Sequence, residues 1–283
     1  MGVSVVDDPA ASRGDLDKLM GRILDDRGLD LSQFRRAYVE RRLAARLRNL
    51  ELHSYREYAD LLASDPAEYA MLIDTLTINV TDFFRDAPMW DILRRRVLPD
   101  IIAEKMRGRS RTIRVWSAGC ASGEEPYSIA MAILDALGPD ADKFLITILG
   151  TDLDPDILEV AAKGEYDKEK LSHIPGTYQV RFTRPLARVS FEVLPEVRRH
   201  VRFKQSSLFD NSPMKVADLI LCRNVFIYLD RVRQAKVLDA FWGSMARGGY
   251  LVLGRSEKMT IDSARRFEPI ESKERIYRKP SRI

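Results

Sequence analysis

Residues 112–131, TIRVWSAGCASGEEPYSIAM, indicate the fold class of this 283-residue chain. The first seven are mostly β-branched or apolar, which predicts a strand over 112–118. Small residues follow at 119–123, and PYSIAMAILDAL (126–137) predicts a helix. A strand, a turn of small residues and a helix are typical of the strand–helix–strand unit of a parallel sheet.

The same alternation continues along the rest of the chain. FLITILGTDLD (144–154) predicts a second strand, and PDILEVAAKG (155–164) predicts the helix after it. A helix is also predicted over 230–249, and further strands at 201–205, 218–224, 249–254 and 275–279. We therefore predict an α/β fold, a doubly wound and mostly parallel sheet with helices on both faces.

Other segments depart from this pattern. Residues 166–200 carry short strand-like pieces between Pro and Gly, and predict a small inserted antiparallel β-subdomain. Residues 15–104 show helical periodicity and predict an N-terminal all-helical domain. A flexible tail (1–14) precedes it, and the basic linker KMRGRSR (105–111) separates it from the α/β domain (112–283).

Composition narrows the class of protein. Apolar residues make up 45% of the chain, which supports a packed core. No apolar run approaches the roughly 20 residues that span a bilayer, and the N-terminus lacks a signal-peptide layout. The two cysteines and three histidines show no metal-binding spacing, so we expect no metal site. These features predict a cytoplasmic protein, and nothing in them requires more than a monomer.

One predicted helix is rich in arginine. Val39, Leu43, Leu47 and Leu50 fall on one face at helical spacing. Residues 35–48 hold six arginines and one glutamate, although a solvated face usually mixes signs to gain i,i+4 pairs. A solvated face and a surface for an acidic partner are both compatible with this pattern.

Acidic residues follow two strands where a doubly wound sheet binds its ligands. Glu124 and Glu125 come directly after the small residues 119–123, with no basic residue to hold a phosphate. Two carboxylates there disfavour NAD and ATP and favour a ligand with a cationic amine, such as S-adenosylmethionine. Asp152 and Asp154 end the second strand, where an acid accepts ribose hydroxyls in nucleoside sites.

The segment ADLILCRNVFIYLD (217–230) combines a buried strand with polar residues at its end. Arg223, Asn224 and Tyr228 would lie at the carboxyl edge of the sheet. These residues could belong to a site. Alternatively, Arg223 could pair with a nearby acid and Tyr228 could cap a core.

Four ordered motifs resemble the CheR family of chemoreceptor glutamate methyltransferases. They are TINVTDFFRD (77–86), WSAGCASGEEPYSIAM (116–131), GTDLD (150–154) and LILCRNVFIYLD (219–230). The segment VERRLAARL…YREYADLL is similar to the family's N-terminal domain. The resemblance covers roughly residues 15–280.

The resemblance implies a class I methyltransferase-like fold and particular roles for residues. It implies that Asn79, Thr81 and Arg85 contact the cofactor or the active site. Glu124, with Glu125 as the alternative, would hold the methionine amine, and Asp152 the ribose. The resemblance implies further cofactor contacts from Arg223 and Asn224. At the adenine it implies Ser207 and Leu208, although the family usually carries Asn or Asp before this Leu. Asp210 could compensate for the serine. Tyr228 matches the active-site tyrosine.

The resemblance also implies the reaction, which is methyl transfer from S-adenosylmethionine to glutamates of receptor cytoplasmic helices. The products are glutamyl methyl esters and S-adenosylhomocysteine. The acceptor carboxylate, with a pKa of about 4.3, is already ionised at neutral pH, so no general base is needed. A planar guanidinium fixes the orientation of a carboxylate, so we assign that role to Arg85, assisted by Tyr228.

The expected partner is the cytoplasmic domain of transmembrane chemoreceptors, so the protein would be recruited to receptor arrays. Arg35, Arg42 and Arg46 are the candidate docking residues for its acidic helices. We expect the helical domain to fold back over the active site. Nucleic acid is not an expected partner, because the (D/N)PP(Y/F) motif of amine methyltransferases is absent. A small-molecule O-methyltransferase would need a base or a metal, and a non-catalytic sensor would not need Arg85 or Tyr228.

Overall fold

The computed structural model describes residues 9–76, 81–108 and 110–281. These residues form two compact units. The first unit takes the described residues up to 76 together with Tyr228–Arg233, and the second takes the rest. Residues 81–104, which the sequence assigned to the helical domain, therefore group with the sheet.

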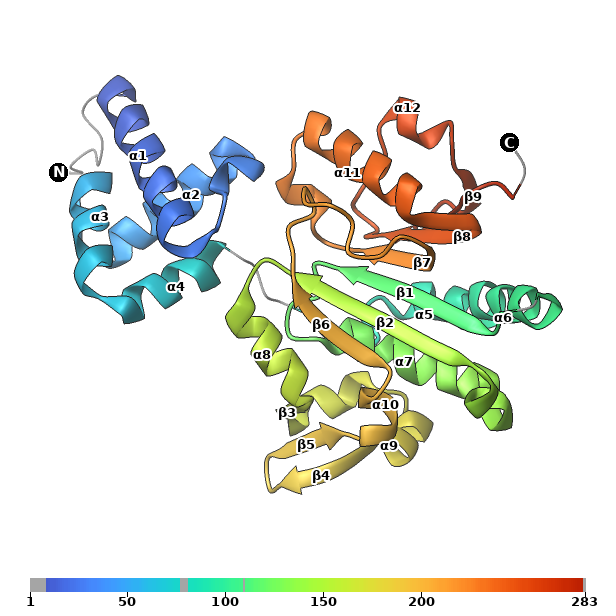
Figure 1. Cartoon of the computed structure of the whole chain (residues 1–283). Coiled ribbons are helices and arrows are strands. Elements are labelled where there is room, and N and C mark those ends of the chain that lie inside the picture. The colour runs from blue at the N-terminus through green and yellow to red at the C-terminus, as the bar shows by residue number, and fades with distance from the viewer. Residues whose placement is uncertain (1–8, 77–80, 109, 282–283) are drawn as a thin grey trace. The chain divides into compact units, whose positions relative to one another are not determined.

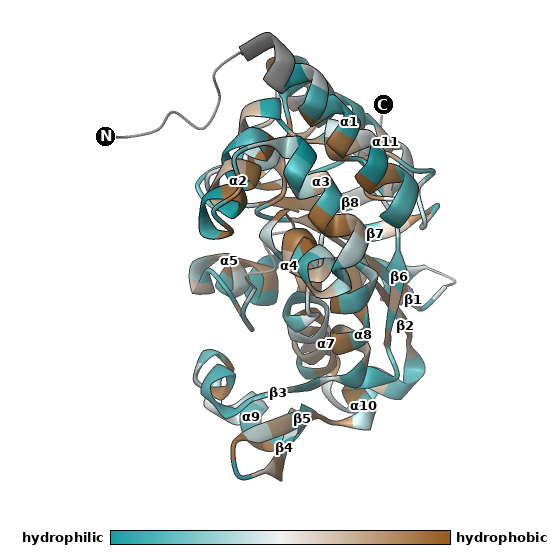
Figure 2. Cartoon of the chain, turned by 90° about the vertical axis from the view of Figure 1, so that its left-hand side faces the viewer, coloured by the Kyte–Doolittle hydropathy of each residue, from teal (hydrophilic) through white to brown (hydrophobic). Residues whose placement is uncertain are grey.

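The first unit is helical, as expected from its periodicity (Figure 1). Each of its helices carries both hydrophilic and hydrophobic residues (Figure 2), so each can bury one face. In α2, Val39, Leu43 and Leu47 are buried, as expected from their spacing, whereas Leu50 follows the helix and is half-buried. The elements are α1 (Pro9–Arg27), η1 (Leu31–Gln33), α2 (Arg36–Asn49), α3 (Tyr55–Ser64) and α4 (Pro66–Leu76). Since α1 begins at Pro9, part of the expected flexible tail is helical, and residues 1–8 lie outside the described residues.

The second unit is built on a seven-stranded sheet with the order β6-β2-β1-β7-β8-β10-β9. The first five strands in this order are parallel, and β10 is antiparallel to both of its neighbours. The mostly parallel doubly wound sheet is therefore confirmed. The strands are β1 (Thr112–Ala118), β2 (Leu145–Asp152), β6 (Val201–Gln205), β7 (Ala217–Cys222), β8 (Met245–Leu253), β9 (Glu268–Glu271) and β10 (Ile276–Arg278).

Helices cover both faces of this sheet because successive side chains of a strand point to opposite faces. Ile113 and Val115 of β1 are buried in a core that α7 shares. Trp116 points to the other face and meets Phe241 of α11 edge-on, with ring centroids 5.1 Å apart. Figure 1 shows α7 and α11 on opposite sides of the sheet. The helices of this unit are α5 (Ala87–Ile92), η2 (Leu93–Val97, a π-helical turn), α6 (Leu98–Arg107), α7 (Glu124–Leu137), η3 (Gly138–Lys143), α8 (Pro155–Lys163), η5 (Phe226–Tyr228, which crosses into the first unit), α11 (Arg231–Ser244, which begins there) and α12 (Ile261–Ala264).

The expected insert is present as a small antiparallel sheet with the order β3-β5-β4. Its strands are β3 (Glu165–Asp167), β4 (Thr183–Ala187) and β5 (Ser190–Val193). Three short helices accompany them, namely η4 (Lys168–His173), α9 (Gly176–Phe182) and α10 (Pro195–Arg198). We call residues 165–200 the β-lobe.

Two details differ from the expectations. The helix predicted over 230–249 ends at Ser244, because Met245 already pairs with Ala217 in the sheet. Strand β9, EPIE, was not predicted, since a proline between acidic residues carries little strand signal. In residues 9–76, 81–108 and 110–281, each helix falls short of the length or the apolar character that a bilayer-spanning helix requires.

Candidate cofactor and active site

The loop after β1 is shaped by two glycines that side chains could not replace. Gly119 has φ = 77°, and a Cβ there would lie 2.5 Å from Cγ2 of Val225. Gly123 has φ = 91° and immediately precedes α7. The N–H groups of Gly119 and Cys120 both donate to the carbonyl of Thr151, at 2.8 and 3.0 Å. The loop is thereby fastened between the end of β2 and the segment that follows β7.

Glu124 and Glu125 begin α7, and each has partners inside the protein. Glu124 is 0% exposed. One of its carboxylate oxygens pairs with Lys170, and the other accepts a hydrogen bond from Ser122 at 2.7 Å. Glu125 accepts from the Ser117 hydroxyl at 2.7 Å and pairs with Arg223. Both acids thus lie at the helix N-terminus, where the helix dipole favours negative charge.

Asp152 ends β2 with one carboxylate oxygen facing the loop after β1. The Ala121 N–H donates to it at 2.9 Å. Burial raises the pKa of Asp152 above its ordinary value, although backbone N–H groups including that of Ala121 oppose the change. Asp154 has a different task, because it caps α8 by accepting from the N–H groups of Asp156 and Ile157. The other oxygen of Asp152 accepts from the Asp154 N–H at 3.2 Å, so both acids have backbone partners, and the ribose contact of Asp152 stays a prediction.

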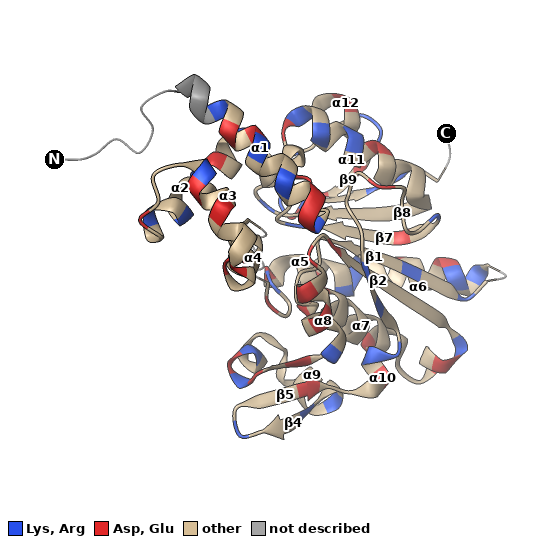
Figure 3. Cartoon of the chain, turned by 60° about the vertical axis from the view of Figure 1, so that its left-hand side comes forward, with Lys and Arg blue, Asp and Glu red and all other residues tan. Residues whose placement is uncertain are grey.

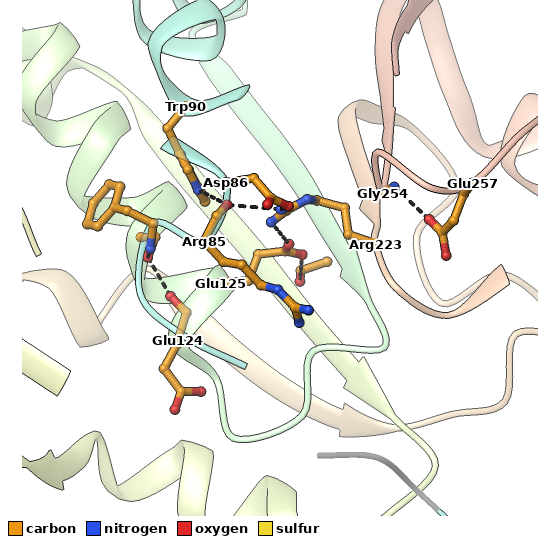
Figure 4. Close-up of polar contacts among 11 residues, drawn as sticks. Arg85, Asp86, Trp90, Glu124, Glu125, Arg223, Gly254 and Glu257 are labelled. Atoms are coloured by element: carbon orange, nitrogen blue, oxygen red, sulfur yellow. Dashed lines mark hydrogen bonds and ion pairs between the residues drawn. The ribbon is translucent and has the colours of Figure 1, made fainter. Parts of the chain in front are cut away.

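Arg223 joins three segments at the carboxyl edge of the sheet. Its guanidinium donates to Glu125 at 3.0 Å, to the Arg85 carbonyl at 2.9 Å and to the Asp86 carboxylate (Figure 4). The alternative in which Arg223 pairs with a nearby acid is thus realised. Whether Arg223 also contacts a cofactor stays a prediction.

The segment around Arg85 is held rigidly on both sides. The Trp90 indole donates to the Arg85 carbonyl at 2.9 Å, and the Phe84 N–H donates to the Ser128 hydroxyl of α7 at 3.0 Å. Phe84 and Asp86 both adopt positive φ, 50° and 65°. Such strain persists only where the surroundings impose it and is often found at functional sites. The Arg85 side chain is half-buried and extends away from Trp90 (Figure 4).

The two phenylalanines of this segment provide its packing. Phe83 meets Tyr166 of the β-lobe edge-on at 4.9 Å, and Phe84 meets Trp90 at 5.0 Å. Both phenylalanines are buried. Thr81 is half-buried at the start of the described part of this segment, and Asn79 lies outside the described residues.

The turn after β7 is organised by an acid that the sequence analysis missed. Asn224 has φ = 62°, which asparagine tolerates better than most residues. Glu257, buried after β8, accepts from the N–H groups of Phe226 at 2.7 Å and Gly254 at 2.6 Å. Burial raises the pKa of Glu257, while these N–H groups oppose the change. The sequence could have pointed to Glu257, because it is a carboxylate close to the end of a predicted strand, as Asp152 is.

Tyr228 belongs to the first unit. Its carbonyl accepts from the Arg35 N–H at 2.8 Å, and its ring packs on Tyr38 with centroids 4.8 Å apart. Nε of Arg35 donates to the Leu229 carbonyl, also at 2.8 Å. Arg35, a predicted docking residue, therefore fastens the segment that carries Tyr228.

The other two predicted docking arginines differ from each other. Arg46 pairs with Glu68, which is itself buried and also accepts from the Tyr58 hydroxyl. The Arg42 guanidinium lies over the Tyr38 ring, 5.6 Å from its centroid. Arg46 is thus tied to the interior of its own unit, and the docking prediction is better tested at Arg42. Figure 3 shows acidic as well as basic residues on the helices of this unit.

The predicted adenine contacts lie in a turn after β6. The Ser207 hydroxyl accepts from the Phe209 N–H at 3.1 Å, and the Ser207 N–H donates to Asp210 at 2.8 Å. Leu208 is half-buried between them. Asp210, suggested as a compensation for the serine, thus contributes to the turn itself.

The donor set of this edge suits S-adenosylmethionine. Glu124 and Glu125 offer carboxylates for a cationic amine and Asp152 offers one for ribose hydroxyls. Glu124 is paired with Lys170 and Glu125 with Arg223, so basic residues do lie beside this loop, contrary to the expectation from the sequence. Among residues 9–76, 81–108 and 110–281, no group of three or more His, Cys, Asp and Glu is placed to hold a metal ion. The fold and the acidic strand ends together are those of a class I methyltransferase-like protein.

Comparison with known proteins identifies the family. Residues 79–276 match the domain described as "CheR methyltransferase, SAM binding domain", and residues 14–77 match "CheR methyltransferase, all-alpha domain". The chain belongs to the CheR methyltransferase family, whose cofactor is S-adenosylmethionine.

Two curated relatives cover most of the chain. A chemotaxis protein methyltransferase of Listeria monocytogenes is 35% identical over 83% of this chain and 86% of its own length. Another, from Borreliella burgdorferi, is 30% identical over 87% and 88%. A solved structure, the N-methyltransferase NodS from Bradyrhizobium japonicum WM9 with S-adenosyl-L-homocysteine, is 16% identical over 70% of this chain and 90% of its own. Its TM-score is 0.37.

Proposed function

We propose that this protein transfers a methyl group from S-adenosylmethionine to glutamate side chains on the cytoplasmic helices of chemoreceptors. The names of its relatives, chemotaxis protein methyltransferases, support the pathway. The products are a glutamyl methyl ester and S-adenosylhomocysteine. The protein acts in the cytoplasm as a monomer, at receptor arrays, and without a metal.

The cofactor is held by the residues at the carboxyl edge of the sheet. Glu124 binds the amine of its methionine end and Asp152 binds the ribose. Thr81, Asn224 and the turn at Ser207 and Leu208 complete the contacts, together with Asn79 and Arg223. The supporting observation is the concentration of carboxylates after β1 and at the end of β2, of which Glu124 and Glu125 are buried and Asp152 is half-buried.

The reaction needs positioning more than proton transfer. The sulfonium of the cofactor supplies an electrophilic methyl group, which passes to a carboxylate oxygen while the electrons of the broken C–S bond stay on sulfur. The glutamate acceptor is already ionised, with an ordinary pKa of about 4.3. Precise alignment of reactants can lower a barrier by about 7–11 kcal/mol.

Arg85 provides this positioning. The observation that carries the proposal is the fixed backbone of Arg85, whose carbonyl accepts from both Trp90 and Arg223. A guanidinium on a rigid backbone loses little entropy when its fork binds a carboxylate. Tyr228 is assigned the role of the family's active-site tyrosine.

The receptor helices dock on the arginine-rich face of α2. Arg42 is the residue to test, because Arg35 is hydrogen-bonded and Arg46 ion-paired within their own unit, whereas Arg42 lies over the Tyr38 ring. Charge reversal at Arg42 should raise the KM for receptor by about tenfold or more and leave cofactor affinity unchanged. An unchanged KM would refute the docking surface.

The reaction is tested by supplying S-adenosylmethionine with a tritiated methyl group to receptor-enriched membranes. Label released by mild base as methanol identifies a carboxyl methyl ester, and base-stable label would refute it. Arg85→Ala should bind S-adenosylhomocysteine normally and transfer at least 100-fold more slowly, from about 3 kcal/mol of lost positioning. Arg95→Ala, which removes an exposed arginine of η2, is the matched control. Full transfer by Arg85→Ala would refute its role.

A further inference from the structure

A lysine of the β-lobe lies within the set of residues that the cofactor would contact. Nζ of Lys170, in η4, pairs with the carboxylate of Glu124 and donates to the Thr81 carbonyl at 3.3 Å. Glu124 and Thr81 were both assigned to the cofactor, whereas Lys170 has no assigned role. The Lys170 side chain is 31% exposed and that of Glu124 is 0% exposed, so the pair runs from the interior towards solvent.

The β-lobe holds this loop at a second point. The Tyr166 hydroxyl donates to the Ser122 carbonyl at 2.7 Å, and the Ser122 hydroxyl donates to Glu124 at 2.7 Å. The position of Lys170 relative to Glu124 is therefore set by packing on both sides. An ammonium has three N–H donors, of which Glu124 and Thr81 take two. Among the described residues, no acceptor occupies the third.

The pair changes what Glu124 can bind. A buried carboxylate that already has a cation beside it gains little from a second isolated cation, because the two positive charges repel each other. The methionine end of the cofactor carries an α-carboxylate next to its amine. A zwitterion can place its amine on Glu124 and its carboxylate on Lys170, so that charges alternate in sign.

On this basis we propose that Lys170 and Glu124 together form a receptor for an amino-acid zwitterion, with Lys170 binding the cofactor's α-carboxylate. The inference rests on the proposed cofactor site and adds a cofactor contact from the β-lobe. It assigns to this lobe the recognition of one end of the cofactor.

The test compares two ligands that differ only in the carboxylate. S-adenosylhomocysteine and its decarboxylated analogue, with a 3-aminopropylthio group in place of homocysteine, are titrated calorimetrically into the full-length protein. The wild-type protein should prefer S-adenosylhomocysteine. Lys170→Met should weaken S-adenosylhomocysteine by about tenfold or more, the size of a charge-assisted hydrogen bond, and change the analogue by less than about threefold.

Two variants serve as controls. Lys170→Arg keeps the cation and should keep most of the preference, and Lys168→Met removes an exposed lysine of the same short helix and should change neither affinity. A thermal unfolding curve of each variant without ligand shows whether it is folded.

Other results would overturn the inference. Equal weakening of both ligands by Lys170→Met would make the lysine a purely structural tie. Tighter binding of S-adenosylhomocysteine would make Lys170 a competitor of the amine. If the wild-type protein bound neither ligand, the proposed cofactor site would fall first and the inference with it. The inference alone would fail if the wild-type protein preferred S-adenosylhomocysteine to the analogue and Lys170→Met left this preference unchanged.

Discussion

The guanidinium of Arg223 donates to the carboxylate of Glu125 at 3.0 Å, across the space between the end of β7 and the start of α7. Both side chains are almost fully buried. The other terminal nitrogen of the same guanidinium donates to the carbonyl of Arg85. One planar group therefore fixes the distance between the sheet and the segment that we assign to the substrate.

Removing Arg223 should destabilise the second unit strongly. Arg223→Met leaves the Glu125 carboxylate buried without its countercharge, which typically costs about 3–5 kcal/mol. Urea unfolding measures this loss. The double variant with Glu125→Gln should recover part of it, because no uncompensated charge then remains. Equal stability of the single and double variants would show that the Glu125 charge is not the cause.

Replacing Glu257 should loosen the turn that carries Asn224. Glu257→Ala leaves two buried N–H groups, those of Phe226 and Gly254, without their acceptor, at a cost of about 1–3 kcal/mol each. We expect lower stability in urea and faster hydrogen exchange at residues 224–226. Glu268→Gln removes an exposed carboxylate nearby in the sequence and should change neither quantity. Unchanged exchange in Glu257→Ala would show that the turn holds itself.

A methyl group at Gly119 should be among the most damaging small changes in the chain. Gly119→Ala puts Cβ 2.5 Å from Val225 and forces alanine to φ = 77°, so we expect a loss of about 2 kcal/mol or more. Gly21→Ala is the matched control, since it lies in α1 with no atom within 4 Å of the new Cβ. That control should be neutral or stabilising by up to about 1 kcal/mol. Thermal unfolding of the two variants decides the matter, and similar midpoints would contradict the expectation.

Acid should weaken the first unit through Glu68. Burial alone would raise the pKa of Glu68, but hydrogen bonds from Arg46 and Tyr58 outweigh it and lower the pKa below its ordinary value. A carboxyl with a lowered folded-state pKa stabilises the fold above its unfolded-state pKa of about 4.3. This stabilisation is lost as the pH falls through the lower folded-state pKa.

The measurement is hydrogen exchange of the α2 to α4 amides after incubation from pH 6 to pH 3. At pH 6 the amides of Glu68→Gln should exchange faster than those of the wild type, because the free energy of opening falls by about 3 kcal/mol. The free energy of opening should also depend less on pH in this variant. Asp60→Asn, an exposed acid of α3, should keep the wild-type dependence. If the opening free energy of Glu68→Gln depended on pH as in the wild type, other groups would be the cause of the acid sensitivity.

The predictable parts of this molecule were those that depend on local pattern. The run of β-branched and apolar residues predicted β1, and helical spacing predicted the buried face of α2. The ends of the predicted strands pointed to Glu124 and Asp152. The helix over 230–249 was predicted too long, because Met245 joins the sheet through pairing with distant Ala217.

What the sequence could not supply was the identity of tertiary partners. Arg223 could have been a ligand contact or half of an ion pair, and only the fold brings Glu125 to it. Lys170 lies 46 positions from Glu124 in a lobe without a recognisable motif. Glu257 had a usable signal, a carboxylate shortly after a strand, but its backbone partners depend on the turn after β7.

The grouping of Tyr228–Arg233 with the helical unit limits how the two units could be exchanged by recombination. The polypeptide leaves the sheet unit, contributes six residues to the other unit, and returns. A gene fragment that encodes only residues 81–281 would carry Leu229, which is buried, and would lose Arg35, which donates to its carbonyl. The two units are therefore interleaved in the gene, and recombination would have to exchange both pieces of the helical unit together.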